Sequence, residues 1–172
     1  MDILERPDAR PVSPEDRAQI IEPFISAAQM TLSELARTDL AVRSVYRVND
    51  PRTLADLSAV IGVTADDSGV LVLSFPNDTA TALARRVLAD AVPALDDDLV
   101  RDCLGELANI VAGQAKTLLA DTPYQLVLST PSVLSGAGLG IGSKPGTDGL
   151  IVVFRSDAGD FALQVCLDIN QA

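Results

Sequence analysis

The chain has 172 residues, of which 48% are apolar and 3% aromatic, and its formal net charge is −11. This length suits one domain with a single core, and that core must be built mainly from Leu, Val, Ile and Ala side chains. The negative charge argues against nucleic acid and anionic membranes as partners, because phosphate groups are bound by clustered Lys and Arg side chains.

The N-terminal part of the chain is predicted to be helical. Residues 1–12 are charged and contain two prolines, which predicts a flexible leader before the folded part. Ser13 is a good N-cap for a short helix over 14–21. Because Pro23 lacks the amide hydrogen that a helix interior needs, this helix is expected to break there and a longer one to follow over 22–37.

The middle of the chain is predicted to hold three strands and two helices. Stretches rich in Val, Leu and Tyr predict strands over 40–48, 56–63 and 70–75. The turn residues between the second and third of these strands predict a hairpin over 65–69. Helices are predicted over 79–91 and about 97–120. The second begins with a run of aspartates that its dipole favours, which is a simpler explanation of these acids than a metal site.

The last third of the chain is predicted to contain strands around a glycine-rich segment. Strands are expected over 124–129, 150–155 and 161–169. Residues 135–149 contain six glycines, but no helix start follows them, which argues against a phosphate-binding loop and for a flexible connector or an edge segment. The order of the elements predicts an α+β fold, a single domain over 13–172 with helices packed over an antiparallel β-sheet.

A polar stripe distinguishes the second of the two predicted helices. With a step of about 100° per residue, one side of the helix carries Asp102, Glu106, Asn109, Gly113 and Lys116. The opposite side is apolar and is expected to be buried. Its residues are Val100, Leu104, Leu107, Val111 and Leu118. The stripe is therefore expected to face solvent.

Small residues border this stripe. Gly105, Ala112 and Gly113 flank Glu106 and Asn109, so no tall side chain is expected beside the two polar groups. A glycine inside a helix costs about 1 kcal/mol relative to alanine. Such a low surface favours the close approach of another molecule, while the alternative is a solvated face that tolerates two glycines.

The composition restricts the chemistry open to the chain. It has no histidine, the usual general base and the commonest metal ligand. Cys103 and Cys166 are far apart in sequence and are predicted to be reduced core residues, so a metal site is not expected. Without an apolar run of 18 residues or a signal peptide, the chain is predicted to be cytoplasmic and to lack a membrane span.

The stripe also carries a resemblance to a known family. The run from Glu106 to Lys116, with Asp102 one turn before it and Pro131 beyond the next strand, resembles the signature of the CheC/CheX chemotaxis phosphatase family. The resemblance extends over most of the chain and implies the fold of that family. Only one such helix is present, as in the CheX-like members, which implies a single-site subunit that pairs as a homodimer.

The resemblance implies a phosphatase that hydrolyses the aspartyl phosphate of a CheY-like response-regulator receiver domain. By motif, Asn109 positions the attacking water and Glu106 docks to the receiver lysine. The expected partner contacts are Asp102, Gly105, Ala112, Gly113 and Lys116. No cofactor is expected in this chain, because the receiver is implied to supply Mg²⁺.

Several interpretations stay open at this stage. Asp102 can contact the partner or simply favour the helix start, and Lys116 can be an ordinary surface residue. The main alternative function is a non-catalytic receiver-binding or flagellar-switch-type module with the same fold. A further alternative is a structural dimer in which the small residues of the helix pack against a second helix.

Overall fold

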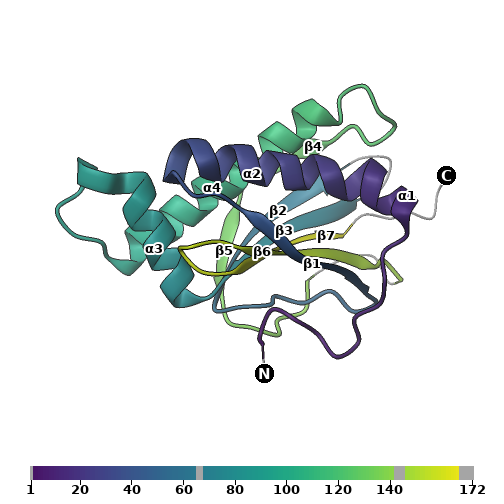
Figure 1. The fold of residues 1–172 in the computed structure, drawn as a ribbon, viewed down its shortest axis with the longest axis horizontal. Coiled ribbons are helices and arrows are strands. Elements are labelled where there is room, and N and C mark those ends of the chain that lie inside the picture. Colours follow the sequence, from purple (N-terminus) through teal and green to yellow (C-terminus); the bar gives the residue numbers. More distant parts are fainter. Residues whose placement is uncertain (1, 65–67, 142–145, 167–172) are drawn as a thin grey trace.

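The computed structural model describes residues 2–64, 68–141 and 146–166, and its elements form a helical layer and a sheet (Figure 1). The helical elements are α1 (Pro14–Asp16), a π-helical turn (Arg17–Ile21), α2 (Glu22–Ala36), α3 (Asn77–Leu88), a 3-10 turn (Ala89–Ala91) and α4 (Asp97–Leu118). The strands are β1 (Ala41–Val48), β2 (Leu57–Thr64), β3 (Ser68–Phe75), β4 (Val127–Leu128), β5 (Ser132–Ser135), β6 (Gly149–Arg155) and β7 (Phe161–Cys166). The α+β prediction is confirmed.

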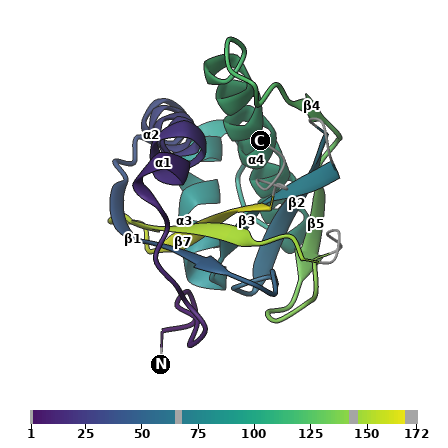
Figure 2. The same ribbon diagram turned by 90° about the vertical axis from the view of Figure 1, so that its right-hand side faces the viewer.

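The strands pair antiparallel in the order β1-β6-β7-β3-β2, and β4 and β5 both pair with β2 at the far edge. Helices α2 and α4 lie over one face of this sheet, and α3 lies at one end of it (Figures 1 and 2). The main core fills the space between these layers. Its largest side chains, each fully buried, are Phe24, Phe75, Phe154 and Phe161. The helices are therefore held on a rigid platform.

The second face of the sheet is covered in part by the N-terminal segment. Strand β6 alternates between the two faces, and Ile151 and Val153 on its second face are fully buried in a smaller cluster with Leu4. The Tyr46 hydroxyl donates a hydrogen bond of 2.6 Å to the Leu4 carbonyl. Where the sequence predicts a flexible leader over 1–12, the structure packs Leu4 on the sheet, because the apolar side chains of β6 on this face need a cover.

The helix break predicted at Pro23 is instead a π-helical turn. The backbone N–H of Glu22 bonds to the carbonyl of Arg17, five residues back, and the chain then continues directly into α2. Proline falls in the first turn of α2, where its missing donor is tolerated. The widened turn thus lets one helical segment run past a proline that interrupts the ordinary bonding pattern.

The strands agree with the sequence over most of their length, with one addition. Strand β5 lies where the sequence predicts no strand, and it begins directly after Pro131, a residue that is rarely found inside strands. The predicted strand over 124–129 is reduced to β4. Parts of two predictions, the turn over 65–69 and the strand over 161–169, lie outside the described residues.

The glycine-rich segment runs along the chain just before β2. The N–H groups of Gly136 and Gly138 donate to the carbonyls of Asp56 and Thr53, each at 2.8 Å. Both glycines have positive φ angles, 115° and 74°, which other residues rarely adopt. In the described residues of this segment the edge interpretation therefore holds, and no helix follows it.

Candidate functional site

Helix α4 carries the predicted site, and its start is fixed by an aspartate. The side chain of Asp96 accepts a hydrogen bond of 2.8 Å from the backbone N–H of Leu99, which satisfies one of the free donors at the helix end. Asp97 and Asp98 occupy the first turn, where the helix dipole favours negative charge. Across the described ranges, no group of three or more acidic, cysteine or histidine residues is arranged to hold a metal ion.

The predicted polar stripe faces solvent. The side chains of Asp102, Glu106, Asn109 and Lys116 are exposed on α4. In the part of the chain that the structure describes, none of the four makes a side-chain hydrogen bond or an ion pair. A carboxylate and a carboxamide one helical turn apart are thus available to an external molecule. Together they can bind a basic group and a water molecule.

The opposite face of α4 is buried as predicted, with one exception. Val100, Leu104, Leu107 and Val111 are at most 6% exposed. Leu118, predicted to lie on this face, is 45% exposed. Leu118 is the last residue of α4, and the last buried residue within this helix is Ala115.

Gly105, predicted to be a partner contact, is buried by the chain itself. A Cβ atom on Gly105 would lie 3.6 Å from Cγ2 of Val133 and 3.8 Å from Cγ of Pro131. Arg101 fastens the same strand to the helix: its guanidinium donates to the Val133 carbonyl at 3.1 Å and also to the Ser135 hydroxyl. Gly105 therefore lets β5 approach α4, which disfavours it as a contact for a partner.

The two other small residues differ from each other. Ala112, also predicted to be a partner contact, is fully buried in the main core, which disfavours such a contact. With a step of about 100° per residue, Ala112 and Gly105 fall on the same edge of the stripe, toward β5. Gly113 falls nearer Glu106, and a Cβ atom there would meet nothing within 4 Å. A low, open helical surface therefore exists at Gly113 alone.

An apolar hollow that sequence reasoning missed adjoins the stripe on the side away from β5. This groove, named here the α2–α3–α4 groove, has a volume of about 210 Å³. Its lining residues are Leu35, Val87, Leu88, Leu99, Asp102, Cys103, Glu106, Leu107 and Ile110. Several of these side chains fit the apolar periods of their own helices. Only the packing of three helices creates the groove.

Cys103 contributes a neutral thiol to this groove. Its side chain is 6% exposed, and burial raises the pKa of the thiol to about 11. The groove therefore places a neutral thiol beside the Asp102 and Glu106 carboxylates, both of which also belong to the stripe.

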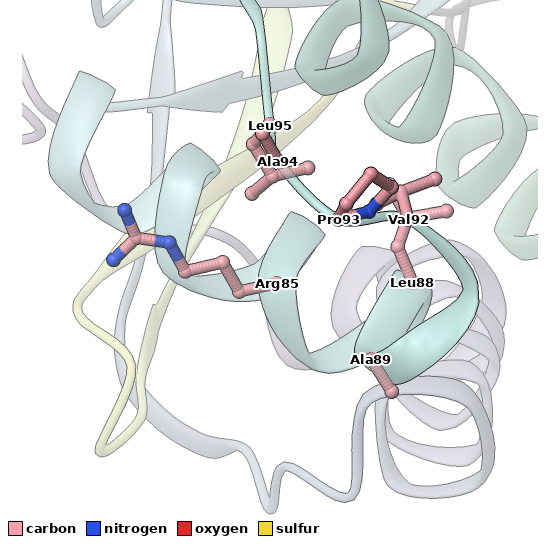
Figure 3. Close-up of a pocket in the computed structure, with 7 residues that line it drawn as sticks. All are labelled: Arg85, Leu88, Ala89, Val92, Pro93, Ala94 and Leu95. Carbon is pink, nitrogen blue, oxygen red and sulfur yellow. The ribbon is translucent and has the colours of Figure 1, made fainter.

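A second, larger hollow lies at the end of α3 and is separate from the stripe. It has a volume of about 610 Å³ and is open to solvent between α3 and the segment that leads to α4 (Figure 3). Its lining includes the charged residue Arg85, whose guanidinium points away from the other lining residues in Figure 3. No residue of the predicted site reaches this hollow, so it offers no arrangement for catalysis.

Comparison with known proteins finds a matching family model and a similar named protein. A family model described as "Chemotaxis phosphatase CheX" matches residues 57–155. The CheY-P phosphatase CheX of Thermotoga maritima is 25% identical over 126 residues, which cover 73% of this chain and 81% of the relative. No helix in the described ranges is long and apolar enough to cross a membrane.

Solved structures share the fold. CheX from Desulfovibrio desulfuricans has a TM-score of 0.75 at 27% identity, covering 87% of this chain and 99% of that chain. A CheX–CheY–BeF3–Mg²⁺ complex from Borrelia burgdorferi has a TM-score of 0.64 at 22% identity, covering 85% and 96% of the two chains. At that identity the second likeness concerns the fold alone.

Proposed function

The chain belongs to the CheX family of chemotaxis phosphatases, and on that premise we propose that it hydrolyses the aspartyl phosphate of a CheY-like receiver domain. One observation carries the proposal to this chain. Glu106 and Asn109 are exposed one turn apart on α4, and neither side chain has a hydrogen-bonding partner among the described residues. Both side chains are thus free to engage a second protein.

In the proposed mechanism Asn109 orients the attacking water. An aspartyl phosphate is an activated acyl phosphate, so the chain needs to bring a water molecule in line with the leaving oxygen. A carboxamide can accept a hydrogen bond from this water and also donate one to it, as the water-positioning glutamine of GTPases does. No histidine is needed for this step, and the chain has none.

Glu106 is proposed to dock the receiver. Its carboxylate can pair with the lysine that receivers hold beside the phosphoryl group. The receiver is proposed to supply Mg²⁺, which neutralises the phosphoryl oxygens, so this chain itself binds no metal ion in the proposal. The open surface at Gly113 supports a close approach of the receiver to this side of the helix.

Asp102 and Lys116 complete the proposed contact surface at the two ends of the stripe. Both side chains are exposed and accessible to a partner. We also propose that the chain acts in the cytoplasm, and that it pairs as a homodimer like the single-helix members that it resembles.

The direct test uses CheY-like receiver domains charged with acetyl phosphate in the presence of Mg²⁺. The wild-type chain should accelerate the release of inorganic phosphate from at least one receiver of a panel. If a receiver binds but its phosphate release is not accelerated, the receiver-binding module is favoured. If no receiver binds and none is dephosphorylated, the proposal that this chain acts on a receiver is contradicted.

The variant Glu106→Lys tests the docking role in the same assay. It brings like charges together at the receiver lysine, which should weaken binding by several kcal/mol. Stability should stay close to wild type, because the side chain is exposed. Unchanged affinity for the receiver would contradict the docking role.

A further inference from the structure

The α2–α3–α4 groove and the polar stripe share two residues, Asp102 and Glu106. Resting on the proposed phosphatase function, we propose that this groove is its specificity pocket. It binds one large apolar side chain of the receiver, next to the basic group that pairs with Glu106. The stripe would then carry the chemistry and the groove would select the receiver.

The walls of the groove come from three helices and present apolar surface. Leu35 at the end of α2 is 38% exposed. Val87 of α3 and Leu99 and Ile110 of α4 are half-buried. Apolar side chains that stay partly exposed around a concave surface gain free energy when another apolar group covers them.

The size of the groove favours a side chain over a metabolite. Its volume of about 210 Å³ is below the range of about 300–1,000 Å³ typical of small-molecule sites. Among the described residues, no hydroxyl, amide or cationic side chain lines it. A small polar ligand would find few hydrogen-bond donors to orient it, and an anionic ligand would meet two carboxylates.

The charge at the rim specifies the surroundings of that apolar side chain. Neither Asp102 nor Glu106 has an ion-pair partner within the described ranges, so both carboxylates favour a basic group on the incoming protein. Because the pKa of the Cys103 thiol is raised, this thiol is neutral and adds no further charge. The groove therefore fits an apolar side chain beside a lysine or arginine, which agrees with the docking role proposed for Glu106.

A second copy of this chain is a poorer occupant. If this groove lies at the two-fold axis of a symmetric pair, the rim carboxylates of the two copies come close to each other. Like charges facing each other disfavour such an interface.

Filling the groove tests the proposal. Val87→Trp places a large side chain in it from α3 and leaves the Glu106 and Asn109 side chains of α4 unchanged in the sequence. The matched control is Ile3→Trp, which enlarges an apolar side chain that is 53% exposed in the N-terminal segment. The substrate is the phosphorylated receiver that the wild-type chain dephosphorylates fastest in the panel described above.

We expect Val87→Trp to raise KM for this receiver about 10-fold or more, as when an apolar side chain is kept from its pocket. The value of kcat should change much less, because Asn109, proposed to orient the water, is not among the lining residues of the groove. Ile3→Trp should keep both constants. Leu35→Gln, on the exposed rim, should raise KM by a smaller factor and serves if Val87→Trp does not fold.

The outcomes separate the two proposals. If the wild-type chain dephosphorylates no receiver, the proposed function fails whatever the groove does. If it is active and folded Val87→Trp and Leu35→Gln both keep the wild-type KM, the specificity pocket is overturned. A change in self-association by these variants, with KM unchanged, would assign the groove to a second copy and would also overturn the proposal.

Discussion

Two glycines of α4, eight residues apart, serve opposite purposes. Gly105 is covered by Pro131 and Val133, and a Cβ atom there would already touch them. Gly113 is open, and a Cβ atom there would meet nothing within 4 Å. The sequence presents both in the same way, as small residues beside a polar stripe. In the structure one glycine lets the chain's own strand approach the helix, while the other leaves an open helical surface.

The two flanks of the stripe repeat this difference. Toward β5 the stripe is closed, because Arg101 holds that strand against the helix. On the other flank lies the α2–α3–α4 groove, which is open and apolar. A receiver that docks on Glu106 and Asn109 would therefore extend toward the groove, away from β5.

The largest expected effect comes from placing a large side chain at the open glycine, Gly113. Gly113→Leu should reduce phosphatase activity about 100-fold, since a displacement of about 1 Å can spoil in-line geometry. Stability should stay equal or rise by up to about 1 kcal/mol, because leucine is the better helix former. Phosphate release and thermal melts on the same preparation measure both effects.

The matched control for that variant is Gly113→Ala, whose methyl group should reduce activity far less. Full activity in Gly113→Leu would contradict the view that this surface receives a partner.

The same change to leucine at the closed glycine, Gly105, should lower the stability of the fold. Gly105→Leu overpacks the contact with Pro131 and Val133 and should destabilise the fold by about 1–3 kcal/mol. Gly105→Ala should be tolerated, because its Cβ contacts are at ordinary van der Waals distances. Denaturant unfolding measures the difference. A stable Gly105→Leu that loses only activity would mean that this flank, too, faces the partner.

A smaller effect is expected from loosening the closed flank. Arg101→Met keeps the aliphatic part of the side chain and removes its hydrogen bonds to Val133 and Ser135. Stability should fall by about 1–2 kcal/mol, the usual effect of losing such bonds. Amide hydrogen exchange in β5 should become faster than in β3. Unchanged exchange in β5 would show that other contacts hold this strand.

The smallest effect concerns the buried thiols, one beside the groove and one in the sheet. Burial raises the pKa of Cys103 to about 11 and that of Cys166 to about 12. Because the folded state favours the neutral thiol, this contribution to stability is complete below about pH 9, the ordinary range of a thiol pKa. It is lost as the pH rises toward the folded values.

Urea unfolding at pH 7, 9 and 10.5 tests this sign. The wild-type chain should lose stability over the upper interval, and Cys103→Ser, with no thiol beside the groove, should lose less over the same interval. An equal loss in both would contradict the assignment to this thiol.

Helix α4 and its exposed stripe could be predicted from the sequence, because a long helix shows a clear apolar period. Val100, Leu104, Leu107 and Val111 mark the buried face without reference to the rest of the fold. The burial of Gly105 could not be predicted from the periodicity of the helix. It depends on β5, a strand of four residues that pairs with a partner about 75 residues earlier in the chain.

The groove and the N-terminal packing were missed for a related reason. Leu35 and Val87 fit the apolar periods of their own helices, and only the packing of three helices leaves them around an unfilled hollow. Leu4 stands among charged residues, and only the apolar second face of β6 gives it a buried place. Local patterns thus predict elements, while the sites between elements need the assembled fold.

The central claim is that Asn109 orients the water that attacks the receiver's phosphoryl group. Asn109→Ala is compared with Gln114→Ala, which removes a carboxamide from the same helix outside the stripe. Single-turnover phosphate release and affinity for a BeF3-activated receiver are measured together. We predict a loss of hydrolysis of about 100-fold or more in Asn109→Ala, with affinity nearly unchanged, and wild-type behaviour in Gln114→Ala. Near-wild-type hydrolysis by Asn109→Ala would contradict the account.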